Sequence, residues 1–218
     1  MKRTSFVCLS LIAILFGCST NFTEHTYLYI ENSEIIGEEK ENLLKNLSPT
    51  IWDEIDRSNK YAKELIAEVK KPNSEFKVSP GRYIISGTLA GNITVYDQDR
   101  KILLDETIGI INTVTLDLNE NHIIVADGGF ESIMIEPVST EIQTTLTTGI
   151  WDVGLDVEPG TYSFKAGWGT GYIIVLDRKE EPKVYDVIGN FTESKIELKS
   201  GQKVIITEID RVDIEKVN

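Results

Sequence analysis

The sequence predicts a mainly β protein with two tandem antiparallel β-sandwich or small-barrel modules, preceded by a short helical region. Two observations lead to this expectation. From residue 76 onward, short β-branched and aromatic runs are separated by glycine, proline, asparagine and aspartate, a pattern typical of many short antiparallel strands. The same stretch also repeats about 80 residues later, which indicates two copies of one structural unit.

The N-terminus has the pattern of a bacterial export signal. Lys2 and Arg3 precede an apolar run from Phe6 to Phe16, which is shorter than the roughly 20 residues of a membrane-spanning helix. The run ends in Leu15-Phe16-Gly17-Cys18, which resembles the lipobox of bacterial lipoproteins. The resemblance implies a signal peptide of residues 1–17 and a diacylglycerol-modified Cys18, hence an extracytoplasmic lipoprotein anchored to the bacterial cell membrane. The alternative is an ordinary signal peptide with an incidental cysteine.

The charge of the chain restricts its partners. The formal net charge is −13, and removal of residues 1–17 would take away Lys2 and Arg3 but no acid. Such a negative field repels phosphates, so no nucleic-acid partner is expected and membrane attachment must come from the lipid on Cys18. A diacyl anchor supplies the two chains that stable attachment requires. Since Cys8 lies in the predicted signal peptide, the mature chain would have no partner for a disulfide.

Residues 18–75 are predicted to form a tether and a helical region. A polar tether over 19–24 and a strand over 26–30 precede a short helix over 38–47, whose apolar side carries three leucines. A longer helix is predicted over 49–71, because Ser48 is a suitable N-cap and Pro49 suits the first helical turn. Its apolar stripe would pack on the β modules or bind a partner; the stripe comprises Trp52, Ile55, Ala62, Leu65, Ile66 and Val69.

The repeat defines the two predicted modules, residues 76–138 and 149–217. The segment 78–83 (VSPGRY) matches 157–162 (VEPGTY), and matches continue to Ile135-Glu136-x-Val138 against Ile214-Glu215-x-Val217. In each copy, proline and glycine favour a turn, and the tyrosine that follows favours a strand. Within the first copy, strands are expected near 82–87, 92–97, 101–106, 112–118, 122–126 and 131–138, with counterparts in the second.

The second copy also resembles a known family. Residues 151–162 match the pattern Trp-x-Val-Gly-x-Asp-x-x-Pro-Gly-Thr-Tyr, which is repeated in β-rich surface lipoproteins of Gram-positive bacteria that mostly lack an assigned activity. The first copy lacks the tryptophan and the Val-Gly-x-Asp portion, since residues 72–76 stand there instead. The resemblance implies a secreted, non-catalytic module, and it assigns no functional residues.

Few residues suggest catalytic or metal chemistry. His25 and His122 are far apart in the sequence, and no hydrolase, zinc-protease or nucleotide-loop motif is present. Residues 167–171 (GWGTG) indicate a hairpin loop rather than a phosphate site, because they lack the lysine. Asp97-Gln98-Asp99 resembles the start of a calcium loop but fits a solvated turn better. Asp152 and Asp156 are one carboxylate pair that glycoside hydrolysis would need. No catalytic residue, metal site or cofactor is predicted.

Trp168 and Tyr172 are the predicted ligand-binding residues. The register of the repeat slips by one residue between Tyr162 and Gly171, which places an insertion in this loop. An exposed aromatic loop on a rigid sheet suits stacking on sugars or peptides, and the alternative is that Trp168 folds back onto the core.

The sequence therefore predicts a lipid-anchored cell-envelope protein that is a non-catalytic binding or structural module with an unknown protein or glycan partner. The alternative function is a secreted hydrolase that acts on envelope polysaccharide through a carboxylate pair. A ligand-delivery role for a transporter is disfavoured, because no βαβ rhythm is present.

Overall fold

The computed structural model describes residues 34–167, 169–189 and 193–217. The predicted signal peptide, Cys18, the strand over 26–30 and Trp168 lie outside these residues. The described chain is mainly β and has two sheets and a short helical region, which confirms the predicted fold class. Its elements are α1 (Glu38–Leu44), a 3-10 turn η1 (Pro49–Trp52), β1 (Leu65–Glu68), β2 (Ser74–Phe76), β3 (Gly81–Gly87), β4 (Gly91–Tyr96), β5 (Ile102–Ile108), β6 (Val114–Leu118), β7 (Ile123–Gly128), β8 (Ser132–Pro137), β9 (Thr145–Asp152), β10 (Gly160–Ala166), β11 (Thr170–Leu176), β12 (Lys183–Ile188), β13 (Ser194–Leu198) and β14 (Lys203–Lys216).

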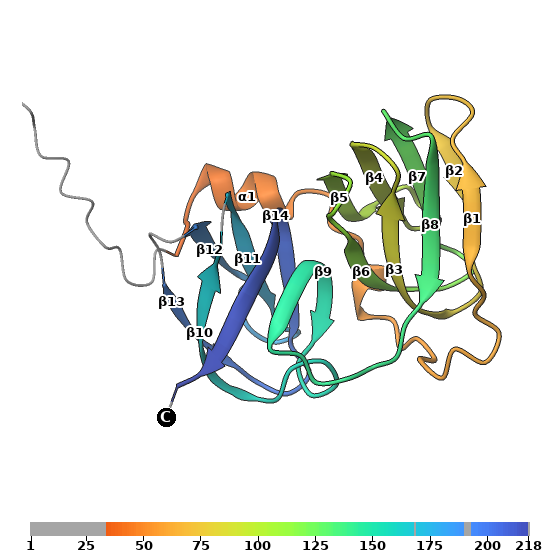
Figure 1. The fold of residues 1–218 in the computed structure, drawn as a ribbon. Helices are drawn as coiled ribbons and strands as arrows, with labels where there is room; N and C mark the ends of the chain where they lie inside the picture. The colour runs from red at the N-terminus through yellow and green to blue at the C-terminus, as the bar shows by residue number, and fades with distance from the viewer. Residues whose placement is uncertain (1–33, 168, 190–192, 218) are drawn as a thin grey trace, which may run out of the picture.

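The first module is an open sandwich of two antiparallel sheets. Strands β1, β8, β3 and β6 form one layer, and β2, β7, β4 and β5 form the other. Side chains that alternate along these strands fill the space between the layers, and Tyr83, Ile93 and Leu116 are fully buried there. Figure 1 shows this module on the right and the second module on the left.

The second module repeats the pairings of the first. β3 pairs with β6 and β8, and β4 pairs with β5 and β7. In the same way β10 pairs with β13 and the second half of β14, whereas β11 pairs with β12 and the first half of β14. β14 thus occupies the places of both β7 and β8. It bends between the two layers of the second module at a bulge between Ile206 and Arg211.

The register also corresponds between the modules. Gly81 faces Leu118 in the first module, and Gly160 faces Leu198 in the second. The tyrosine two residues after each of these glycines is buried, 0 % exposed at Tyr83 and 7 % exposed at Tyr162. The repeated Pro-Gly-x-Tyr segment therefore starts the equivalent strand in both copies and inserts its tyrosine into the core.

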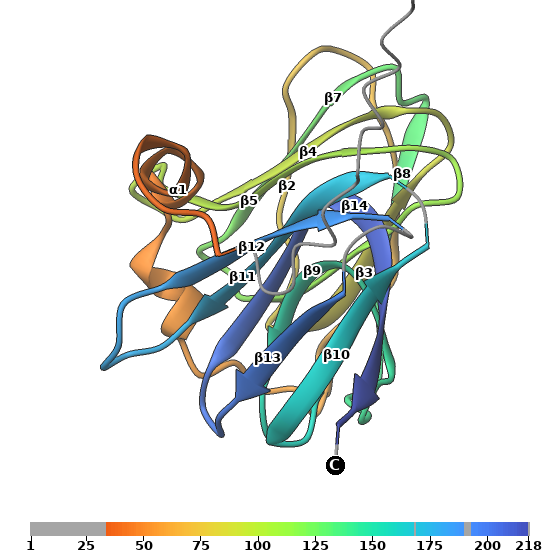
Figure 2. The ribbon, with the colours of Figure 1, turned by 90° about the vertical axis from the view of Figure 1, so that its left-hand side faces the viewer.

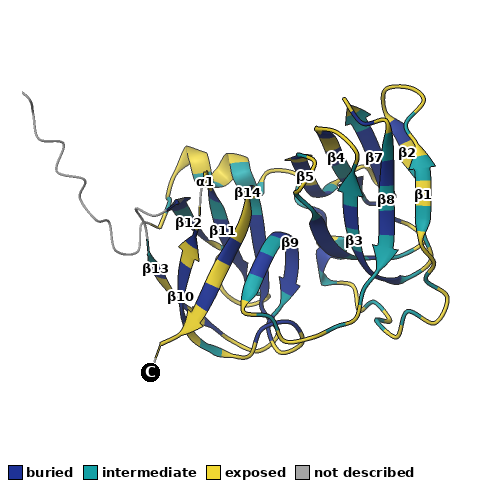
Figure 3. Ribbon diagram, in the orientation of Figure 1, coloured by how far each residue is buried: buried dark blue, intermediate teal, exposed yellow. Residues whose placement is uncertain are grey.

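The two modules share part of their packing. β6 and β9 run parallel and touch where Thr115 faces Gly149, so a sheet continues from one module into the other. The core of the first module also includes Ile150 of β9, Ile174 of β11 and Ile205 of β14. Figure 3 shows buried positions along the strands on both sides of this junction, while the exposed positions gather in the connections.

We call the two ends of the molecule upper and lower, as they appear in Figure 1. The β3–β4 and β5–β6 connections, residues 88–90 and 109–113, lie at the upper end with the β14 bulge. The β11–β12 connection, residues 177–182, lies at the lower end, whereas the β4–β5 connection, residues 97–101, lies beside residues 46–48, which follow α1.

The predicted short helix is present as α1. Leu43 and Leu44 of α1 and Leu47 beyond it pack against the core, as the spacing of the leucines predicted. α1 lies beside the second module (Figure 2), where the Tyr172 hydroxyl donates a hydrogen bond to Glu39 Oε1 at 3.1 Å. Within the described part of the chain, no helix is long and apolar enough to span a membrane.

The predicted helix over 49–71 is wrong. Ser48 does cap a turn, because its Oγ accepts the Thr50 N–H at 3.1 Å, but only the 3-10 turn η1 follows. Asp56 accepts the Ser58 N–H and Asn59 adopts a left-handed conformation with φ 54°, so the chain turns there. Residues 65–68 then form β1, which pairs with β8. The apolar residues of this segment fit the two-residue period of a strand as well as the spacing of the predicted helix; they are Leu65, Ala67 and Val69.

β1 and β2 complete the two sheets of the first module, although both begin before residue 76. β9 begins at Thr145, which likewise precedes the predicted start of the second module at residue 149. β1 therefore lies wholly, and β2 and β9 lie partly, outside the residue ranges predicted for the modules.

Gly149 is expected to be required at the junction of the modules. Its φ is 141°, and a Cβ built there would lie 2.0 Å from the Thr115 carbonyl oxygen of β6. Gly149→Ala should therefore lower the free energy of unfolding by about 3 kcal/mol or more, from overpacking and backbone strain together. Gly201→Ala is the control, because Gly201 has φ 85° with no atom within 4 Å of the built Cβ, and it should cost only about 1 kcal/mol. Equal losses in urea unfolding would contradict the role of this contact.

Candidate functional site

A groove of about 770 Å³ opens where the two modules meet at the lower end of the molecule. Its walls come from three segments: residues 52–57 before β1, the β11–β12 connection at 177–180, and the β13–β14 connection at 199–203. Asp117 of β6 and Asp152 of β9 line its floor. Segments distant in the sequence thus converge on one concavity, as in many binding sites.

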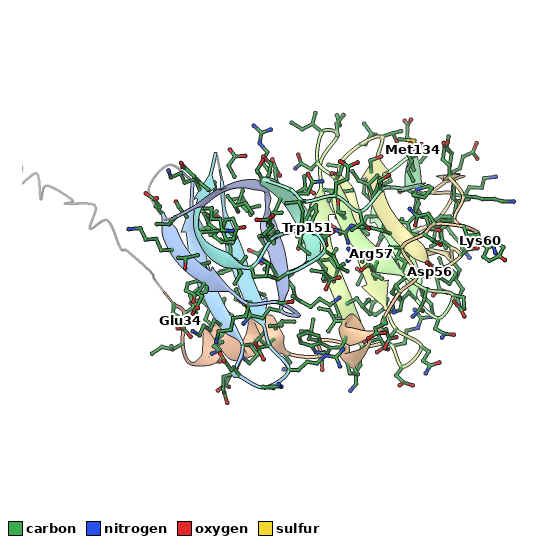
Figure 4. The ribbon with its side chains drawn as sticks, turned by 90° about the horizontal axis from the view of Figure 1, so that it is seen from below. Glu34, Asp56, Arg57, Lys60, Met134 and Trp151 are labelled. Carbon is green, nitrogen blue, oxygen red and sulfur yellow. The ribbon has the colours of Figure 1, made fainter. Side chains whose placement is uncertain are left out.

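Arg57 is the central cation of the floor. Its Nη2 binds Asp117 Oδ2 at 2.6 Å and also contacts Asp152 Oδ2, while its Nη1 binds Asp156 Oδ1 at 2.9 Å. Figure 4 shows Arg57 near the middle of the molecule, between the two modules and close to Trp151. A single guanidinium thus joins a carboxylate of the first module to two carboxylates of the second.

Arg82 lies behind Arg57 and is deeper. It is on β3 and is 1 % exposed, and its guanidinium binds Asp117 Oδ1 and Asp156 Oδ2, each at 3.1 Å. The guanidinium carbon also lies 4.9 Å from the ring centre of Trp151, which adds a cation–π contact between the modules.

Lys203 completes the network, because its Nζ binds Asp152 Oδ1 at 2.6 Å. The network then contains three cations and three carboxylates, so its formal charge is zero. We call it the junction ion cluster; its members are Arg57, Arg82, Asp117, Asp152, Asp156 and Lys203. Buried charges are tolerated when each is paired in this way, whereas removal of one partner leaves a charge uncompensated.

The Asp152 and Asp156 pair that the sequence singled out does come together, but both carboxylates are engaged by cations. Asp156 is 1 % exposed and accepts the Asp152 N–H at 2.8 Å in addition to its two arginine contacts. Burial raises the pKa of Asp156, while Arg82, the Asp152 N–H and Arg57 oppose that shift. A general acid must reach the substrate with its proton, and this geometry gives the pair a structural role at the groove floor.

The walls of the groove present mixed charges and apolar surface. The Arg178 guanidinium lies 5.2 Å from the Trp52 ring centre, and its Nη2 donates to the Trp52 carbonyl at 2.8 Å. Lys199 pairs with Glu180 at 2.7 Å on the opposite wall. Lys179 is exposed and Leu155 is 53 % exposed at the rim. The groove therefore offers hydrogen-bond donors, acceptors and apolar contact without a strong net charge.

Tyr172, the other predicted aromatic, lies on β11 at the upper end and does not line this groove. It borders a shallow hollow formed with Glu38, Glu39, Asn42 and Leu43 of α1. Burial together with the hydrogen bond and charge of Glu39 raises the pKa of the Tyr172 hydroxyl. The structure thus separates Tyr172 from the junction ion cluster, and Trp168 is outside the described residues.

Asp97 has a structural role in the turn between β4 and β5. Its Oδ1 accepts the N–H groups of Asp99 and Lys101 at 2.8 and 2.9 Å, and its Oδ2 accepts the Ser48 hydroxyl. The sequence prediction of a solvated turn is therefore only partly right, because Asp97 is 2 % exposed. Among the described residues, no group of three or more His, Cys, Asp or Glu side chains is placed to hold a metal ion.

His122 is also buried and structural. Its Nδ1 accepts the Asn119 N–H at 3.2 Å, so its proton is on Nε2, which lies 3.2 Å from Thr50 Oγ1. Burial lowers the pKa of this imidazole, which favours the neutral form.

Glu106 is a buried carboxyl on the upper side of the module junction. It lies on β5, is 5 % exposed, and its Oε2 accepts the Glu208 N–H of the β14 bulge at 3.1 Å. Burial raises the pKa of Glu106 to about 7, and the carboxylates of Glu208 and Asp105 act in the same direction. The first module therefore holds the bulge through a group that ionises near neutral pH.

No family model matches this chain, and no curated protein matches it.

Arg82 should be essential for stability. Arg82→Met would leave Asp117 and Asp156 with one cation fewer in a buried site, and we expect a loss of about 3–5 kcal/mol in the free energy of unfolding. Arg100→Met is the matched control, because Arg100 forms an exposed pair with Glu75 at 2.8 Å, and it should cost less than about 1 kcal/mol. Guanidinium unfolding of both variants measures the difference, and a small loss for Arg82→Met would show that the cluster contributes little.

Glu106 should make stability fall as pH rises. Its folded pKa of about 7 exceeds the ordinary value of 4.5, so its contribution is fully present below pH 4.5 and is lost as pH rises through 7. In Glu106→Gln this loss should disappear. Between pH 4.5 and 8, the free energy of unfolding of the variant should rise by about 2 kcal/mol relative to that of the wild type. Urea unfolding at several pH values checks this, with the exposed Glu64→Gln as control. Parallel pH profiles for wild type and Glu106→Gln would contradict the assignment.

Proposed function

We propose that this protein is a lipid-anchored cell-envelope protein that binds an envelope glycan, without catalysis, in the groove at the module junction. The lipobox pattern around Cys18 supports the anchor. The observation that carries the binding role is the neutralised floor of the groove, where Asp117, Asp152 and Asp156 are all paired with cations. A rigid, charge-balanced floor suits recognition of a polar ligand, since its groups are fixed before the ligand arrives.

The walls favour a glycan over a strongly charged ligand. Trp52 and Leu155 supply apolar surface, and Lys179, Glu180 and Lys199 supply donors and acceptors around it. Sugar rings present alternating apolar faces and hydroxyl groups, which match such a lining. A strongly cationic or anionic ligand would meet like charges on one wall or the other.

The anchor is tested with Cys18→Ala. Without the acceptor cysteine the protein should leave the membrane fraction or retain residues 1–17, because the net charge of −13 disfavours attachment to anionic headgroups by itself. Fractionation of cells and intact-mass measurement read out both effects. Unchanged membrane partitioning and an unchanged mass would exclude lipidation at Cys18.

The groove is tested by calorimetric titration with soluble fragments of cell-wall glycan. The double variant Lys179→Ala with Leu155→Ala should weaken binding about tenfold, which corresponds to roughly 1.4 kcal/mol. The control Lys70→Ala removes an equally flexible cation that is 79 % exposed away from the groove, and it should bind like the wild type. Equal affinities for all three proteins, or binding only to an envelope protein, would overturn the glycan assignment.

A further inference from the structure

Three large apolar side chains are exposed together at the upper end of the first module. Ile110 and Ile111, at the tip of the β5–β6 connection, are 67 % and 89 % exposed, and Leu89 in the β3–β4 connection is 41 % exposed. The two connections are neighbours, because Gly91 at the start of β4 pairs with Ile108 at the end of β5. We call these three residues the upper apolar tip.

The sequence on either side of this tip lacks charge, although Glu131 and Asp210 on neighbouring segments are acidic. Residues 83–96 and 108–116 contain no Asp, Glu, Lys or Arg, although these residues make up 26 % of the sequence. The connections at the other ends of β4 and β11 are charged instead: residues 97–101 read DQDRK and 177–182 read DRKEEP. Surface connections are usually polar, so an uncharged and apolar tip on one end indicates a contact there.

The first described residues run away from this same end. Glu34 forms an antiparallel bridge with Tyr185, and the Ile35 N–H donates to the Val184 carbonyl at 2.8 Å. At Glu34 the chain therefore runs away from the end where β12 finishes at Ile188. That end is the upper one, where Ile188 pairs with Thr170 at the start of β11.

The upper ends of the two modules are in contact. Asn112, next to Ile111, donates a hydrogen bond to Asp210 in the β14 bulge. The apolar tip and the end from which Glu34 and Ile35 run therefore belong to one end of the molecule.

We propose that the upper apolar tip rests on the lipid bilayer that carries the Cys18 anchor, with Ile110 and Ile111 inserted among the lipids. This inference rests on the proposed lipidation. The three side chains of the tip are apolar and exposed, which suits insertion at a bilayer surface, where burial of each isoleucine adds to the attraction. The anchor keeps the tip at high local concentration near the membrane, so a small apolar contact suffices to set the orientation.

This placement of the bilayer determines which way the proposed groove faces. Asp117 is the last residue but one of β6, and Asp152 ends β9, at the lower end, together with the connections that form the walls. A bilayer at the upper end therefore leaves the groove facing away from the membrane, toward the envelope.

The experiment uses the full-length lipidated protein in phosphatidylcholine vesicles that contain bromine-labelled lipids. A fluorescent label is placed at Ile111→Cys or, as the control, at Leu155→Cys, which is also exposed but lines the groove. Acylated Cys18 does not react with the label, so the introduced cysteine is the only free thiol of the mature chain. Quenching at position 111 should be at least about twice that at position 155.

Flotation and intact mass are measured first, so that the two proposals fail separately. A protein that floats with the vesicles but shows equal quenching at both positions overturns the tip contact and leaves the anchor standing. A protein that neither floats nor carries the lipid overturns the anchor and the tip contact with it. Self-quenching of the label at position 111, but not at position 155, that increases with protein concentration in the absence of vesicles identifies a second copy as the occupant and also overturns the proposal.

Discussion

The pairing of Arg82 with carboxylates from both modules is the constraint on which the rest of this structure depends. Tyr83 and Ile85 of β3 point into the core of the first module, so Arg82 points to the opposite face. That face is buried only because the second module covers it, with Asp156 and the Trp151 ring as partners. The two modules therefore cannot separate without parting the Arg82 guanidinium from the carboxylate of Asp156.

Most of the strand pattern was predictable from the sequence, because each strand is short and bounded by turn residues. The Pro-Gly-x-Tyr segments located the start of β3 and β10 correctly, since proline, glycine and a large aromatic have strong local preferences. The helix predicted after Pro49 was wrong, because that prediction rested on local sequence pattern alone. Its apolar residues fit two periods, and the decision in favour of a strand at 65–68 comes from pairing with β8, which is a tertiary interaction.

Only part of the candidate site could be recognised from the sequence. Asp152 and Asp156 were noticed as carboxylates, but their partner Arg57 lay in a stretch read as a helix, and Lys203 lay more than 40 residues away. One signal could have located Arg82: it replaces Thr161 of the second copy, so a charged residue stands directly before the apolar run Tyr83-Ile84-Ile85. A charge at the start of such a strand, where the other copy has a neutral residue, indicates a charged partner. Glu106 gave a comparable signal, because it stands between Leu104 and Ile108 on the inward-facing side of β5.

The position of β14 has a consequence for how the molecule matures. This strand is the last one described, yet it pairs with β9, β10 and β11 and supplies Ile205 to the core shared with the first module. Its partner β9 begins at Thr145. The chain must therefore close a loop of some sixty residues before the central strand of the second module can pair with β9. A chain in which β14 has not yet paired therefore keeps its second module open, so the last described strand decides when this module closes.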